Sequence, residues 1–99
     1  MQISISGHQL NVTESLKAYI EEKLERIERH AEHITKIEII LTVEKARQKA
    51  EGNAHVAGAD LHASSENDDM YAAIDSMAYK LDRQLVKHRE KTIRRMHGS

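Results

Sequence analysis

Five cations near the end of the sequence recur at the spacing of one face of a helix. Steps of three, four, four and three positions would align them in one positive stripe. Each cation in such a row can neutralise one phosphate and release a condensed counterion, which favours nucleic-acid binding. The alternative is a helix face that is simply exposed to solvent, where runs of charged residues usually lie. The five residues are Lys80, Arg83, Lys87, Lys91 and Arg94.

An apolar series with the same period lies about a quarter-turn away on this segment. One helix would therefore bury one face and present cations on the next. Between Lys80 and Arg95 there are seven Lys or Arg residues and only two acids. The apolar series consists of Met70, Ile74, Met77, Leu81, Leu85 and His88, with His88 expected at the edge of the core.

The composition indicates one compact domain, which we place at residues 1–95, with a disordered tail at 96–99. The net charge is only −1, so a nucleic-acid site requires segregated charge: residues 1–67 carry eight cations and eleven acids, and residues 68–99 carry seven and five.

The chain has no cysteine, which excludes disulfides and Cys-based zinc sites and is typical of a reducing cytoplasm. No apolar run approaches membrane-spanning length and no secretion signal is evident, so we expect a cytoplasmic protein without membrane contact.

The N-terminal half alternates between strand and helix patterns. Residues 2–6 alternate apolar and polar side chains up to Gly7, which predicts a short strand. Thr13 is a favourable N-cap for a helix that we expect to run to about Glu32. Its apolar stripe comprises Leu16, Ile20, Leu24, Ile27 and Ala31. Residues 36–44 alternate again, with Ile37, Ile39, Leu41 and Val43 facing inward and Ile40 outward.

The C-terminal half predicts a hairpin followed by the cationic helix. Residues 45–49 are polar and indicate a loop or a frayed strand extension. Ala54 and Val56 are expected to pair with Leu61 and Ala63 across a turn at Gly58 and Ala59, and Asp68 and Asp69 to open the final helix. The order predicts a two-layer α+β fold, β-α-β-β-β-α, with a four-stranded mixed sheet and both helices on one face. Double-stranded-RNA-binding domains resemble part of this order, which is weak evidence alone.

The first helix also separates its charges. The acids Glu21, Glu25, Glu28 and Glu32 lie opposite its apolar stripe. Along one flank run Tyr19, Lys23, Arg26 and His30. If that flank adjoins the stripe that begins at Lys80, the two helices would form one basic groove beside an acidic back.

Other kinds of site are poorly supported. The predicted hairpin places His55 opposite His62, but zinc generally needs a third or fourth ligand, so we expect no metal and no cofactor. No Gly-rich phosphate loop and no converging acid–base pair is evident, so we expect no enzymatic activity. The only aromatic residues are three tyrosines, which favours recognition of the backbone and shape of folded RNA over aromatic platforms for single strands.

The run Asp69-Met70-Tyr71-Ala72-Ala73-Ile74-Asp75, with residues 80–81 and 83–88, closely resembles the ribosome hibernation factors. This bacterial family includes protein Y and has been called sigma-54 modulation proteins. Matches at residues 1–7, 13–14, 55–56 and 62–64 extend the resemblance over nearly the whole chain. Because we see neither a long C-terminal dimerisation domain nor an acidic tail in the sequence, we expect it to resemble the short, hibernation-promoting members.

The resemblance implies a domain that binds the small ribosomal subunit near the decoding centre. There it would block messenger and transfer RNA and promote inactive ribosome dimers in stationary phase, while being a monomer when free. Family members bind ribosomal RNA through the basic face of the two helices, which here implies Lys23, Arg26, Lys80, Arg83, Lys87 and Lys91; we add Arg94 and Arg95, where the chain departs from shorter members. The alternative is a protein–protein regulator of transcription, as the older family name suggests.

Overall fold

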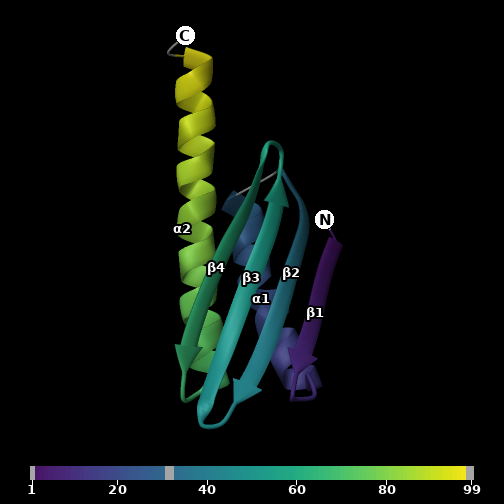
Figure 1. The fold of residues 1–99 in the computed structure, drawn as a ribbon. Coiled ribbons are helices and arrows are strands. Elements are labelled where there is room, and N and C mark those ends of the chain that lie inside the picture. Colours follow the sequence, from purple (N-terminus) through teal and green to yellow (C-terminus); the bar gives the residue numbers. More distant parts are fainter. Residues whose placement is uncertain (1, 31–32, 98–99) are drawn as a thin grey trace.

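The computed structural model describes residues 2–30 and 33–97, with the side chains of His30 and residues 92–97 outside the described part. The element order is the predicted one, and Figure 1 shows both helices on the same side of the sheet. This arrangement confirms the two-layer α+β fold. The elements are β1 (Gln2–His8), α1 (Glu14–His30), β2 (Ile34–Glu44), β3 (Arg47–Val56), β4 (Ala59–Asn67) and α2 (Met70–His97).

The four strands form one mixed sheet in the order β1-β2-β3-β4. β1 pairs with β2 in parallel, and the other two pairings are antiparallel. The parallel pair requires a crossover, which α1 supplies, and short turns suffice for the rest. Both helices start at the same end of the sheet, and the C-terminal part of α2 extends beyond the other end (Figure 1).

The core lies between the helices and the inner face of the sheet. The described apolar residues of both predicted helix stripes are buried, and His88 is half-buried, as expected for the edge of the core. On β2, Ile37, Ile39 and Leu41 are buried and Val43 is half-buried. Ala31 and Glu32, predicted to end the first helix, lie outside the described residues. Thr13 is the N-cap of α1, as predicted, because its Oγ1 accepts a hydrogen bond from the Leu16 amide at 3.2 Å. The fully buried large side chains are Ile20, Leu24, Ile37, Ile39, Leu41, Ile74, Met77 and Leu81.

Small side chains on β3 allow α2 to approach the sheet closely. A Cβ atom added to Gly52 would lie 2.7 Å from Met77 Sδ and 3.2 Å from Leu81 Cδ2. Ala50 and Ala54, two positions to either side of Gly52, are completely buried. These residues therefore form a shallow surface on which α2 rests, and a larger side chain there would push the helix outward.

The strand that leads to the hairpin is longer than the sequence predicted. A turn at Lys45 and Ala46, with Lys45 at φ 55°, connects β2 to β3, which already begins at Arg47. Residues 45–49 were expected to form either a loop or a strand extension. Lys45 and Ala46 form a turn, and the strand extension begins at Arg47. The inner face here carries alanine and glycine, so no alternation of large apolar side chains marked the strand.

The predicted register of the β3–β4 hairpin is wrong by two residues. Val56 pairs with Ala59 rather than with Leu61, so His55 stands opposite Asp60 and His62 stands opposite Asn53. The turn consists of Ala57 and Gly58, and Gly58 adopts φ 81°, which glycine accommodates without strain. This two-residue turn closes the hairpin sooner than the turn at Gly58 and Ala59 that we expected, so His55 and His62 do not face each other.

The ends of two elements also extend beyond their predicted limits. β1 continues through Gly7 to His8, and Ile3 on this strand is 42% exposed. The backbone of α2 is helical through His97, which includes the first two residues of the predicted disordered tail. Within the described ranges, neither helix has the length and apolar character needed to cross a membrane.

Candidate nucleic-acid interface

The start of α2 is fixed by an N-cap. The Asp69 Oδ1 atom accepts a hydrogen bond from the Tyr71 amide at 3.1 Å, and the Asp69 carbonyl accepts one from Ala73 at 3.0 Å. Asn67 Oδ1 in turn accepts a bond from the Asp69 amide at 3.0 Å. Asp69 is therefore the N-cap, as predicted, and the cap ties the start of α2 to the end of β4.

The buried face of α2 determines where its cations point. Leu81 and Leu85 are buried, and the cations between and after them are exposed. We call Lys80, Arg83, Lys87 and Lys91 the cation row; all four side chains are exposed. Arg94 and Arg95 belong to the same helix, but their side chains lie outside the described part. The row fulfils the geometric requirement for a ladder of phosphate contacts.

The first cation of the row is anchored to the edge of the sheet. Lys80 Nζ donates a hydrogen bond to the Ser64 carbonyl at 3.0 Å, and Gln84 Nε2 donates one to the His62 carbonyl. Both acceptors belong to β4, so this side of α2 faces the β4 edge. An ammonium has three donors, so Lys80 can still contact an anion.

The basic flank of α1 contacts the other side of α2. Lys23 Nζ lies 3.1 Å from Asp75 Oδ1, and the Tyr19 hydroxyl donates a hydrogen bond to the same oxygen at 2.6 Å. The Tyr19 and Tyr71 rings meet edge to face with centroids 4.9 Å apart, and Lys23 Nζ lies 5.1 Å from the Tyr19 centroid. This cluster fastens the two helices together at their N-terminal halves.

These contacts shift the pKa values of Asp75, Tyr19 and Lys23. The hydrogen bond from Tyr19 and the nearby Lys23 ammonium lower the pKa of Asp75, so its carboxylate stays ionised. The bond to Asp75 raises the pKa of both Tyr19 and Lys23, because each keeps its proton to donate it. Lys23 is therefore a cation whose charge is already partly neutralised.

The first cation of the row therefore does not adjoin the α1 flank. Asp75 and Lys80 are five positions apart, which is about 140° around an α-helix, so they lie on opposite sides of the buried stripe. Lys23 faces Asp75, and the cation row begins beside β4. Arg26 is exposed next to Lys23 on the α1 flank. The exposed Glu21, Glu25 and Glu28 form the predicted acidic back of α1, without Glu32, which is not described.

The outer face of the sheet carries a separate polar network. His55 Nε2 lies 2.9 Å from Glu38 Oε1, and His55 Nδ1 lies 2.7 Å from Asp60 Oδ1. The hydrogen bonds to these two acids raise the pKa of His55, and the bond from His55 and the charge of Lys36 lower that of Glu38. His62 instead contacts Asn53 Oδ1, at 2.6 Å. Among the described residues, no group of three or more His, Cys, Asp or Glu side chains could hold a metal ion.

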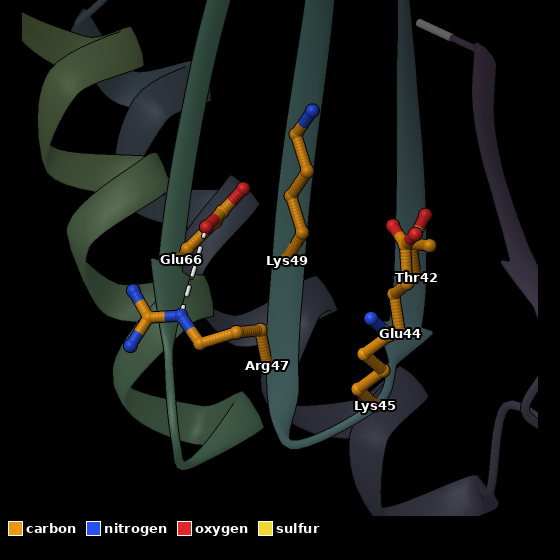
Figure 2. A pocket seen from close by; sticks show the side chains of 6 residues that line it. All are labelled: Thr42, Glu44, Lys45, Arg47, Lys49 and Glu66. Atoms are coloured by element: carbon orange, nitrogen blue, oxygen red, sulfur yellow. Dashed lines mark ion pairs between the residues drawn. The ribbon is translucent and has the colours of Figure 1, made fainter.

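A shallow pocket lies on the outer sheet face near the β2–β3 turn (Figure 2). Two of its three cations pair with acids: Arg47 Nε lies 3.6 Å from Glu66 Oε2, and Lys49 Nζ lies 3.1 Å from Glu51 Oε1. The pocket thus differs from the cation row, where positive charge predominates. Its lining consists of Thr42, Glu44, Lys45, Arg47, Lys49 and Glu66.

Two contacts that shape the interface were not predicted. Asp75 was part of a recognised motif, but its role as the partner of Lys23 depends on how the helices face each other. Nothing in the sequence around Gln84 predicted its hydrogen bond to the His62 carbonyl of β4. Asp75 lies four positions after Tyr71, so the two share one face of the helix. Their contact with α1 could have been predicted only if the side of α2 against which α1 packs had been known.

Comparison with known proteins identifies the relatives of this chain. Residues 3–93 match the sequence profile of the family described as Sigma 54 modulation protein / S30EA ribosomal protein. A protein of Azotobacter vinelandii named ribosome hibernation promoting factor is 57% identical over 98 residues, which cover 99% of this chain and 92% of that protein. A protein of the same name from Pseudomonas putida is 46% identical over 99 residues, covering 100% of this chain and 97% of its own.

Two solved structures resemble this chain over most of its length. A ribosomal subunit interface protein from Coxiella burnetii has a TM-score of 0.86 at 31% identity and covers 91% of this chain and 99% of its own. The N-terminal domain of Thermus thermophilus Protein Y has a TM-score of 0.83 at 27% identity, with coverage of 89% and 99%. From the profile match and the relatives, this chain belongs to the Sigma 54 modulation protein / S30EA ribosomal protein family.

Proposed function

We propose that this protein is a ribosome hibernation factor that silences ribosomes by occupancy rather than by catalysis. It binds the small ribosomal subunit near the decoding centre, blocks messenger and transfer RNA, and promotes inactive ribosome dimers in stationary phase. The proposal rests on one observation: a chain similar over 99% of its length to a ribosome hibernation promoting factor presents an exposed row of four cations on α2.

The binding surface in this proposal is the cation row together with the α1 flank. Arg83, Lys87 and Lys91 contact phosphates of ribosomal RNA, and Lys80 contributes from its position beside β4. Arg26 and the partly neutralised Lys23 extend the surface across α1. Arg94 and Arg95 belong to the last turns of the same helix and are included in the proposed surface.

Occupancy requires only binding energy and a rigid shape. The Asp69 cap, the buried face of α2 and the close packing at Gly52 hold the row in one orientation before it meets RNA. A preformed row loses little conformational freedom on binding, so more of the electrostatic attraction contributes to affinity. The protein acts in the cytoplasm as a monomer until it binds the ribosome.

Sedimentation in a sucrose gradient tests this proposal. At low salt the protein should sediment with small subunits and shift a fraction of ribosomes to the position of dimers, and it should leave the subunits when the salt is raised. If it sedimented with no ribosomal particle, but bound a transcription factor with an affinity insensitive to salt, the regulator of transcription would be the better description.

A further inference from the structure

Tyr79 is the most exposed large hydrophobic side chain in the described part of the chain, at 65%. The other two tyrosines are engaged, because Tyr19 and Tyr71 pack against each other and the Tyr19 hydroxyl binds Asp75. Among the described side chains, none forms a hydrogen bond or ring contact with Tyr79. A single exposed aromatic is common on protein surfaces, so its neighbours must decide whether it has a role.

Those neighbours place Tyr79 in line with the cation row. Side chains four positions apart form a continuous ridge on an α-helix, and Tyr79 begins a ridge that continues with Arg83, Lys87 and Lys91. Val86, seven positions after Tyr79 and 37% exposed, adds an apolar surface on nearly the same side of the helix. The ring and the three cations therefore share one ridge of α2.

The one acid directly before Tyr79 on this ridge does not weaken the arrangement. Asp75 is covered by the ammonium of Lys23 at 3.1 Å and by the hydroxyl of Tyr19 at 2.6 Å. Its negative charge is thus turned toward α1 and balanced there. A polyanion approaching the ridge from Tyr79 would meet an aromatic face and then Arg83, with the charge of Asp75 already balanced on the α1 side.

We propose that Tyr79 stacks on an unpaired nucleobase of the RNA whose phosphates lie along Arg83, Lys87 and Lys91. This inference rests on the proposed function and adds a specific contact to it. Every base has a π-face, so the ring would accept any unpaired base and would favour loops and bulges over duplex. The three cations in line with the ring favour RNA, whose phosphates carry regularly spaced negative charge, over a typical protein interface, whose centre is depleted of charged residues.

Affinity measurements on purified small subunits, at two salt concentrations, can test this contact. Tyr79→Ala should weaken binding by about 5- to 100-fold at both salt concentrations, because a stacked ring releases no counterion. Tyr79→Phe should bind like the original protein, since it keeps the ring. Lys87→Ala is the matched control: it should reduce the salt dependence itself. Thermal unfolding of both Tyr79 variants should be unchanged, because the side chain is mostly exposed.

The outcomes separate this inference from the proposed function. If Lys87→Ala lowers the salt dependence but Tyr79→Ala binds normally, the stacking contact is refuted and the proposed function stands. If Tyr79→Phe is as weak as Tyr79→Ala, the hydroxyl rather than the ring matters, which also refutes stacking. If the unaltered protein does not bind small subunits at any salt concentration, both proposals fail.

Discussion

Replacing Lys87 by glutamate probes the middle of the cation row. Lys87 is exposed, lies between Arg83 and Lys91 on one ridge, and has no contact with the core. Lys17→Glu is a matched control with the same change in charge. Lys17 is exposed on α1, two positions and about 200° of rotation from the flank residue Tyr19, so it faces away from the proposed interface.

The expected magnitude follows from the number of cations. Each phosphate contact contributes about −0.7 to −0.9 to the slope of log affinity against log salt, so the four contacts of the cation row give about −2.8 to −3.6. A rise from about 50 to 200 mM salt should then weaken binding of the original protein by roughly 50- to 150-fold. Lys87→Glu should reduce the slope by about one and lower affinity at low salt by about tenfold or more, since it also introduces repulsion.

A salt series of equilibrium binding to purified small subunits measures both quantities. Lys17→Glu should keep the slope of the original protein and most of its affinity. Both variants should unfold at nearly the same temperature as the original protein, because both positions are exposed. Equal loss of affinity in the two variants, or an unchanged slope in Lys87→Glu, would refute the assignment of the cation row as the RNA-binding surface.

Three further substitutions test the scaffold that positions the row. Tyr71→Ala removes the edge-to-face contact with Tyr19 and a side chain that is 38% exposed, so chemical denaturation should show a loss of about 1–3 kcal/mol. Gly52→Ala places a Cβ 2.7 Å from Met77 Sδ and should cost about 1–3 kcal/mol; a variant as stable as the original would contradict the close packing. His55→Gln should remove a pH dependence of stability. The pKa of His55 is raised in the fold, so its contribution is complete below the pKa of an unfolded histidine and is lost as pH rises through the folded pKa; an unchanged pH profile would exclude this contribution.

The sequence sufficed for the element order because large apolar side chains mark those elements clearly. Leu16, Ile20 and Leu24 recur at helical spacing, and Ile37, Ile39 and Leu41 alternate, so each pattern allows one interpretation. The start of β3 and the hairpin register were harder to predict. Alanine and glycine fill the inner face there, and small residues do not distinguish one register from another that is shifted by two.

The candidate site was predictable along one helix but not between helices. The period of Lys80, Arg83, Lys87 and Lys91 identified an exposed row, because a single amphipathic helix fixes which residues share a face. Whether Lys23 adjoins that row depends on the side of α2 against which α1 packs. That choice is made by the whole core, and local spacing does not contain it.

Competition for the small subunit tests the central claim most directly. Small subunits are first loaded with messenger RNA and labelled initiator transfer RNA, the protein is then titrated in at low salt, and bound RNA and protein are measured in the same gradient fractions. If the protein occupies the path of these ligands, it should bind loaded subunits poorly. On empty subunits it should saturate at about one copy each and block later loading. Subunits that carry the protein, messenger and transfer RNA together would contradict inhibition by occupancy.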